Sequence, residues 1–197
     1  MKSHLKKLHD RPLSWSSLFS FAYNRDEWAK KYLLGIATPA NKLMEFGKTV
    51  GELIATNPKF LPIVPRYEIF EKELKFKVGK IPLVGYIDSF SEDPLAMFEY
   101  KTYSKKDKWT QKVAQDHGQL LMYQAGLWLL YDTPPEKIGC ELVAIQVEET
   151  GDFQMTLSKA PVQIFEVKHT KIEVLNFLVE LQKTYKDMEK FALEYGE

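Results

Sequence analysis

The pattern of hydrophobic and polar positions divides the chain into a helical first part and an alternating second part. Ser14 or Ser16 can cap a helix through Tyr23, a second helix runs to about Leu34, and Asn41 can cap a third over residues 42–56. Between residues 67 and 102 apolar and polar residues alternate, with turn signals at Gly79-Lys80 and between Ser91 and Pro94. The alternation predicts three consecutive antiparallel strands, over residues 67–78, 81–90 and 95–102.

The second half predicts two long helices around three further strands. A helical pattern runs over residues 111–131 and ends at Pro134-Pro135, and a second one runs over residues 171–193. The predicted strands between them cover residues 140–148, 153–157 and 162–167. No repeat or linker interrupts this order, which predicts one domain over residues 1–197 with a mixed sheet and helices on both faces. Its parts are a helical segment over about 14–58, a core over about 67–170 and a closing helix over about 171–194.

Composition narrows the functional classes. The chain has 197 residues with 27 basic and 27 acidic side chains, so a nucleic acid would have to be held by a local basic patch. The single cysteine, Cys140, excludes an internal disulfide and a multi-cysteine metal cluster. The most apolar run, Leu120 to Tyr131, is shorter than the roughly 20 residues of a membrane span, and no signal-peptide pattern is present. These features favour a soluble cytoplasmic protein that makes no membrane contact.

Charged residues in the predicted strands are the first candidates for chemistry. Glu99 and Lys101 are two apart, so their side chains leave the same face of a strand. A turn centred on Glu92-Asp93 would pair Asp88 with Met97 and place it diagonal to Glu99, roughly 7–8 Å away. Two carboxylates and an ammonium group would then form a site for a hard divalent cation that binds a phosphate oxygen and acidifies a water molecule.

A solvated strand face is the ordinary alternative for such charges. Here, however, Ile87 precedes Asp88, and Met97, Phe98 and Tyr100 surround Glu99, so the charges stand in mostly apolar strands. Burial of an unpaired charge is costly, which favours a function for these side chains.

The same residues resemble a known family. Gly85-Tyr-Ile-Asp88, followed by Glu99-Tyr100-Lys101, is similar to the catalytic motif of the PD-(D/E)XK nucleases. Gln119-Leu-Leu-Met-Tyr123 resembles the Gln-x-x-x-Tyr motif of their RecB-like and Cas4-like exonuclease branch, and the segment from Ser14 to Gly35 is similar to the helical segment that precedes the motif. The resemblance covers about residues 14 to 131 and implies a restriction-endonuclease-like α/β core.

The resemblance also implies roles for single residues. Asp88, Glu99 and the backbone carbonyl of Tyr100 would bind Mg²⁺ or Mn²⁺, and Lys101 would be catalytic. Gln119 and Tyr123, which share a helical face, would orient the site or the DNA strand.

Two departures from the family pattern stand out. The helix residue expected to be a metal-binding His is Gly51 here. Glu52, the next residue, points about 100° away around the helix and is kept as a candidate ligand. An all-oxygen site favours Mg²⁺. The cysteines of an iron–sulfur cluster are also missing, so we expect no cluster.

The loop after Lys101 favours a polyanionic substrate. Lysines that can neutralise phosphates alternate with aromatic side chains that can stack on unpaired bases. The expected DNA-binding residues are Lys105, Lys106, Lys108, Trp109 and Lys112. The alternative is a solvated loop. His117 falls on another face of the predicted helix and is interpreted as a surface residue.

Together these features predict a Mg²⁺-dependent deoxyribonuclease of the PD-(D/E)XK type, by resemblance an exonuclease in recombination, repair or phage and mobile-element DNA processing. Its partners would be single-stranded DNA or duplex ends, and a separate helicase or recombination protein. One alternative is a catalytically silent nucleic-acid-binding or assembly module on the same fold, and another is an unrelated metal-free ligand-binding protein. Cleavage mode, polarity, DNA or RNA preference, metal number and oligomeric state stay open.

Overall fold

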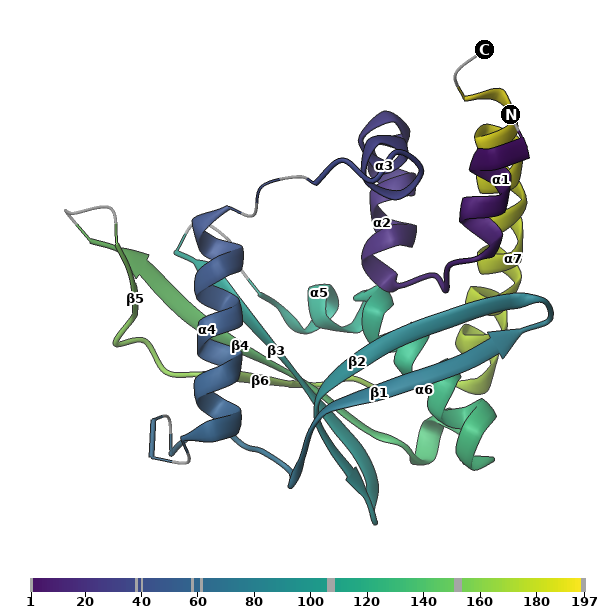
Figure 1. Ribbon diagram of the computed structural model, residues 1–197. Helices are drawn as coiled ribbons and strands as arrows, with labels where there is room; N and C mark the ends of the chain where they lie inside the picture. Colours follow the sequence, from purple (N-terminus) through teal and green to yellow (C-terminus); the bar gives the residue numbers. More distant parts are fainter. Residues whose placement is uncertain are drawn as a thin grey trace.

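The computed structural model describes residues 2–37, 39, 41–57, 59–60, 62–105, 109–150 and 154–195 (Figure 1). The helices are α1 (Lys2–His9), α2 (Trp15–Tyr23), α3 (Arg25–Tyr32), α4 (Lys42–Thr56), α5 (Gln111–Gln115), α6 (Gly118–Tyr131) and α7 (Lys171–Glu194), with a 3-10 helix, η1, at Pro135–Lys137. The strands are β1 (Ile69–Val78), β2 (Ile81–Glu92), β3 (Leu95–Ser104), β4 (Gly139–Glu149), β5 (Met155–Leu157) and β6 (Gln163–Glu166). The predicted fold class, a mixed sheet flanked by helices, is confirmed.

The sheet runs in the order β1-β2-β3-β4-β5, and β6 also pairs with β4. β1, β2 and β3 form the predicted antiparallel meander. β3 and β4 are parallel, because α5 and α6 carry the chain back across one face of the sheet between them. β5 and β6 are antiparallel to β4. The sheet therefore contains both parallel and antiparallel strand pairs.

Alternation along the central strands fills two apolar layers. On β3, Met97 belongs to the larger core, which includes buried residues of α6 and α7, whereas its neighbour Phe98 belongs to a smaller core with α4. On β4, Leu142 faces the larger core and Val143 the smaller one. Helices therefore cover both faces of the sheet, as the sequence predicts.

The helix caps expected at the first helices are present. The Ser14 side chain accepts a hydrogen bond from the backbone N–H of Ser17, and Asn41 accepts one from Met44. α1 was not predicted, because it is short and basic and contributes only Leu8 to the core. It packs beside α7, where His9 contacts Glu189 at 2.8 Å.

Two details differ from the prediction. The pattern over residues 111–131 forms two helices, separated by Asp116 and by His117, which has extended backbone angles. The turn between β2 and β3 is centred on Asp93-Pro94, one residue beyond the predicted Glu92-Asp93, so Phe90, and not Asp88, lies opposite Met97. The predicted strand start at Phe153 lies outside the described residues.

Among the described helices, none has both the length and the apolar character required to cross a membrane.

Candidate active site

Asp88 lies where strand β2 separates from β3. Pairing between the two strands ends at Ser89 and Phe98. At the next position Asp88 Oδ2 accepts a hydrogen bond from the backbone N–H of Tyr100 at 2.7 Å. The carboxylate thus takes the bond that a continuing strand partner would take, and the shifted register brings Asp88 next to Glu99 instead of diagonal to it.

Glu99 and Lys101 leave the same face of β3, as predicted. Only 2% of the Glu99 side chain is exposed, and its Oε1 accepts a hydrogen bond from Lys101 Nζ at 2.6 Å. The second oxygen, Oε2, is buried and has no hydrogen-bond partner among the described residues. An unpaired buried carboxylate oxygen is costly, so this atom is available to a cation or to a hydrogen-bond donor.

The electrostatics of the three groups are coupled. Burial raises the pKa of Asp88 well above its usual range, and the nearby Glu99 raises it further. Burial also raises the pKa of Glu99, although Lys101 counteracts part of this effect. Burial alone would lower the pKa of Lys101, but the carboxylates of Glu99 and Asp88 outweigh it and hold that pKa above its ordinary value. Lys101 is therefore a cation at neutral pH.

Helix α6 connects to this group through side-chain amide and hydroxyl contacts. Lys101 Nζ donates to Gln119 Oε1 at 2.9 Å, and Gln119 Nε2 donates to the Tyr123 hydroxyl at 2.8 Å. The hydroxyl in turn donates to the backbone carbonyl of Tyr86 at 2.8 Å. Gly85 makes room for the ring, since a Cβ there would lie 2.3 Å from Tyr123 Cε1. The two motif residues of α6 therefore hold Lys101 against β2.

A pocket of about 450 Å³ opens beside Asp88 on the α4 side of the sheet. Gly51 and Glu52 line it, and a Cβ at Gly51 would meet nothing within 4 Å. The position of the missing imidazole is thus open space facing Asp88. Glu52 lines the pocket but is mostly exposed and lies 3.7 Å from Lys48.

Glu71 also lines this pocket, although no sequence pattern predicts it as a site residue. It stands on β1 between Phe70 and Lys72, which pair with Ser89 and Ile87 on either side of Asp88. Its φ of 50° is in the left-handed region, which is rare for glutamate. Its charge raises the pKa values of both Asp88 and Glu99. A glutamate in an alternating strand resembles any solvated position, so only the fold reveals it.

The fit of these residues to a divalent cation is partial. Within the described part of the chain, no three His, Cys, Asp or Glu side chains are close enough together to hold a metal ion by themselves. Asp88 and Glu99 nevertheless supply two neighbouring carboxylates with raised pKa values and one unpaired buried oxygen. A cation would relieve both the repulsion and the unpaired oxygen, so the donor set suits a hard metal that also uses backbone or water oxygens.

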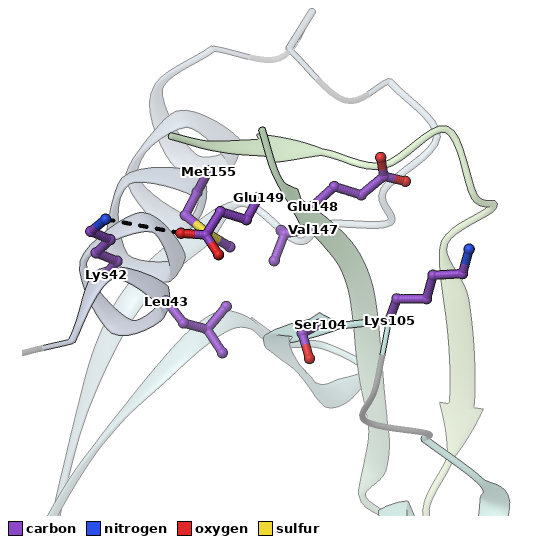
Figure 2. Close-up of a pocket in the computed structure, with 8 residues that line it drawn as sticks. All are labelled: Lys42, Leu43, Ser104, Lys105, Val147, Glu148, Glu149 and Met155. Atoms are coloured by element: carbon purple, nitrogen blue, oxygen red, sulfur yellow. Dashed lines mark ion pairs between the residues drawn. The ribbon is translucent and has the colours of Figure 1, made fainter. Parts of the chain in front are cut away.

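The predicted DNA-binding residues are dispersed. Lys106 and Lys108 lie outside the described residues. Trp109 packs against the main core, and Lys112 is exposed and pairs with Asp116 at 2.9 Å. Lys105 lines a separate pocket of about 570 Å³ (Figure 2). Of these five residues the structure describes three, Lys105, Trp109 and Lys112, and they have different surroundings.

Figure 2 shows Lys42 and Lys105 on opposite sides of that second pocket. Lys42 pairs with Glu149 at 3.9 Å, and Glu148 also lines the pocket. The lining includes apolar side chains such as Met155 but none of the candidate catalytic residues. This pocket is therefore larger than the pocket beside Asp88, but the candidate catalytic residues do not line it.

His117 is partly buried, in contrast to its interpretation as a surface residue. The break between α5 and α6 turns it inward, where its ring centroid lies 5.7 Å from that of Trp109. Its Nδ1 is buried and has no hydrogen-bond partner among the described residues. Burial, together with the charge of Lys101, lowers the pKa of His117 to about 4. A neutral imidazole thus stands beside the site.

Comparisons with known proteins support the fold. No family model and no curated protein matches the chain. Two solved structures do: a candidate exonuclease from Eubacterium rectale, with a TM-score of 0.64 and 11% identity over 98% of this chain and 85% of that one; and a phage-related exonuclease from Haemophilus somnus 129PT, with a TM-score of 0.53 and 13% identity over 99% and 95%. The chain shares their fold. Both matches span nearly its whole length, including the strands and helix that carry the candidate site.

Proposed function

We propose that the protein is a metal-dependent nuclease that hydrolyses DNA phosphodiester bonds. The observation that carries the proposal is the Asp88–Glu99–Lys101 group, in which a buried carboxylate oxygen has no partner in the described chain. Such a group suits a cation and a phosphate far better than it suits folding stability. The fold shared with two structures named as exonucleases supports the same reaction class.

Asp88, Glu99 and the backbone carbonyl of Tyr100 would hold Mg²⁺ or Mn²⁺. When bound, the cation would supply positive charge to a phosphate oxygen and acidify a water molecule. Glu71 and Glu52 line the pocket that opens beside Asp88. In our proposal they act through water, in place of the imidazole that Gly51 cannot supply. Because the carboxylates must ionise to bind a cation, metal affinity should increase with pH.

Lys101 serves as a fixed cation in this proposal. Its pKa is raised by Glu99 and Asp88, so it keeps its proton at neutral pH and does not act as a general base. It can neutralise the charge that develops on the phosphate during attack by water. Gln119 and Tyr123 are positioning residues, because their hydrogen bonds fix the Lys101 ammonium relative to β2.

The finer roles follow the family resemblance. We propose exonuclease action on single-stranded DNA or duplex ends, in recombination, repair or phage and mobile-element processing, in the cytoplasm and beside a separate helicase or recombination protein. Lys105, Trp109 and Lys112 are the described members of the predicted DNA-binding set, and in our proposal they contact the strand. No iron–sulfur cluster takes part.

A catalytically silent DNA-binding module is the second candidate. The observation in its favour is Gly51, where the family's metal-binding imidazole is replaced by open space. The raised pKa values of Asp88 and Glu99 also favour their neutral forms, which bind cations weakly.

The test combines cleavage with metal binding. End-labelled single-stranded and duplex DNA is incubated with wild type and Lys101→Met, in Mg²⁺, Mn²⁺ or EDTA. Lys183→Met is the matched control, because Lys183 is exposed on α7, where it pairs with Glu180 at 2.6 Å. Calorimetry with Mn²⁺ alone, on wild type and Asp88→Asn, reports the metal site independently of turnover.

We expect metal-dependent cleavage by wild type and Lys183→Met, and a loss of at least about a hundredfold in Lys101→Met, in line with the removal of one charge-stabilising group. Mn²⁺ should bind wild type and not Asp88→Asn. Cleavage that persists in Lys101→Met would overturn the assigned chemistry. Binding of DNA without cleavage in either metal would establish the silent module instead.

A further inference from the structure

Helix α2 carries a ladder of aromatic rings on its outer face. Trp15, Phe19 and Tyr23 recur at every fourth residue, so their side chains lie one above the other. The ring centroids of Trp15 and Phe19 are 6.2 Å apart, and those of Phe19 and Tyr23 are 6.0 Å apart with an interplanar angle of 9°. The side chains of Phe19 and Tyr23 are 56% and 84% exposed. Below, the aromatic ladder means these three residues.

Phe19 and Tyr23 of the aromatic ladder lie outside the core, whereas Trp15 packs against it. The buried residues of α2 are Ser17, Leu18 and Phe21, which lie on the opposite side of the helix. Phe21 contacts Phe191 of α7 edge to face at 5.8 Å. In Figure 1 α7 and α4 stand on opposite sides of α2. The ladder therefore faces away from the packed side of the helix, and its two outer rings contribute little to folding.

The foot of the aromatic ladder touches the candidate site. The Trp15 indole packs against Gly118, where a Cβ would lie 2.1 Å from Trp15 Cη2. Gly118 begins α6 and is followed directly by Gln119, which accepts the hydrogen bond from Lys101 at 2.9 Å. The ladder is thus continuous with the residues that position the candidate catalytic lysine.

The aromatic ladder stands on a neutral helix beside a segment of mixed charge, in which Arg25 is followed by Asp26 and Glu27 at the start of α3. The nine residues of α2, WSSLFSFAY, include no charged side chain, so nothing on the helix itself repels phosphates. Stacked exposed rings present flat π surfaces, which suit planar bases, and such stacking accepts every base. Bases in a duplex already stack on one another, so a ladder of this kind selects an unpaired strand.

We propose that the aromatic ladder binds the unpaired bases of a DNA strand and leads it to the Asp88–Glu99–Lys101 group. This inference rests on the proposed function and narrows its substrate from single-stranded DNA or duplex ends to single-stranded DNA, bound over several nucleotides beyond the cleaved bond. Stacking of one base on an aromatic side chain strengthens binding by roughly tenfold to a hundredfold. Removal of the two exposed rings should therefore weaken single-strand binding by about a hundredfold or more.

Binding is measured in EDTA, so that no strand is cleaved, by the fluorescence anisotropy of a labelled twelve-nucleotide oligothymidine and of a labelled duplex. The variants are Phe19→Ala/Tyr23→Ala and the conservative Tyr23→Phe, which keeps the ring. The matched control is Ile172→Ala/Val179→Ala, because those side chains are 69% and 52% exposed on α7, away from the ladder. Thermal unfolding and size-exclusion chromatography accompany each variant.

We expect the double alanine variant to lose single-strand affinity, while Tyr23→Phe and the α7 control bind as wild type does and the weaker duplex binding changes little. The proposal for the ladder is refuted if the double alanine variant binds single strands as tightly as wild type does. It is also refuted if wild type does not bind single-stranded DNA. A wild-type oligomer that becomes monomeric in the double alanine variant also overturns it, because the rings are then a protein contact.

The outcomes for the ladder and for the proposed function can be separated. If wild type cleaves DNA and the double alanine variant binds single strands as tightly as wild type does, the role of the ladder is refuted and the proposed nuclease function stands. If that variant loses single-strand affinity and wild type cleaves DNA in neither metal, the role of the ladder is supported. The proposed nuclease function is then refuted in favour of the silent DNA-binding module.

Discussion

The same substitution, glycine to alanine, should have opposite effects at two positions of the site. A Cβ at Gly85 would lie 2.3 Å from Cε1 of Tyr123, about 1 Å short of the 3.4 Å at which ordinary contact begins. A Cβ at Gly51 would meet nothing within 4 Å, although Gly51 lies inside helix α4. The pair therefore separates the contact of one aromatic ring from the general cost of altering a glycine.

The structure sets the magnitude. In Gly85→Ala the Tyr123 ring must retreat by about 1 Å, and its hydroxyl, now 2.8 Å from the Tyr86 carbonyl, leaves hydrogen-bond range. Overpacking costs about 1–3 kcal/mol and a lost hydrogen bond about 0.5–1.5 kcal/mol, so we expect Gly85→Ala to lower the free energy of unfolding by about 2–4 kcal/mol. Gly51→Ala should raise it by about 0.5–1 kcal/mol, because alanine is the better helix former.

Urea unfolding followed by far-UV circular dichroism measures both free energies. For a chain of this size 1 kcal/mol corresponds to roughly 2–4 °C, so Gly85→Ala should lower Tm by roughly 5–15 °C and Gly51→Ala should raise it by roughly 1–4 °C. If Gly85→Ala changed the free energy by less than about 0.5 kcal/mol, or if both variants shifted it in the same direction, the packing of Tyr123 on β2 would be refuted.

Two further predictions concern pH and use thermal unfolding. The pKa of Asp88 is raised in the folded protein, mainly by burial and then by Glu99, so folding loses stability as pH rises from the ordinary aspartate pKa through the folded one. Asp88→Asn should therefore be more stable than wild type at pH 7 and equally stable at pH 3. The control Asp187→Asn, at an exposed position of α7, should match wild type at both pH values. If Tm of Asp88→Asn differed from that of wild type by the same amount at every pH, the raised pKa of Asp88 would be contradicted. Burial lowers the pKa of His117 to about 4, so the unfolded chain takes up a proton that the folded chain refuses, and stability is lost as pH falls from about 6.5 to 4. His117→Gln should lack this part of the loss, and an unchanged acid limb would show that His117 titrates freely.

Local sequence predicted the elements well and their pairing less well. Alternation between residues 67 and 102 is strong and well punctuated, so the meander and the common face of Glu99 and Lys101 could be read directly. The register could not, because several positions between Ser91 and Pro94 can centre the turn, and the observed pairing of Phe90 with Met97 shifts Asp88 by two residues relative to β3.

The remaining misses come from contacts between distant residues. The break before Gly118 brings α6 against the Trp15 ring, which is about a hundred positions earlier in the chain and leaves no trace in local periodicity. That break turns His117 inward. Glu71 lies on β1 beside Asp88 and has a left-handed backbone conformation. The pattern of apolar residues predicts neither its conformation nor its position at the site. Gln119 and Tyr123, in contrast, follow from helical spacing and a motif, and the structure places both at Lys101.

The order of the elements has a consequence for synthesis. Every side chain of the candidate site lies between Glu52 and Tyr123, yet α6 is buried partly by α7, whose residues are synthesised after all of them. Val174, Leu181 and Met188 of α7 are all buried. Until they emerge, the nascent chain holds a nearly finished site on a helix whose apolar surface is uncovered. Stalled or nicked chains that lack α7 should therefore aggregate rather than misfold locally, and chaperone demand should be highest between the synthesis of α6 and that of α7.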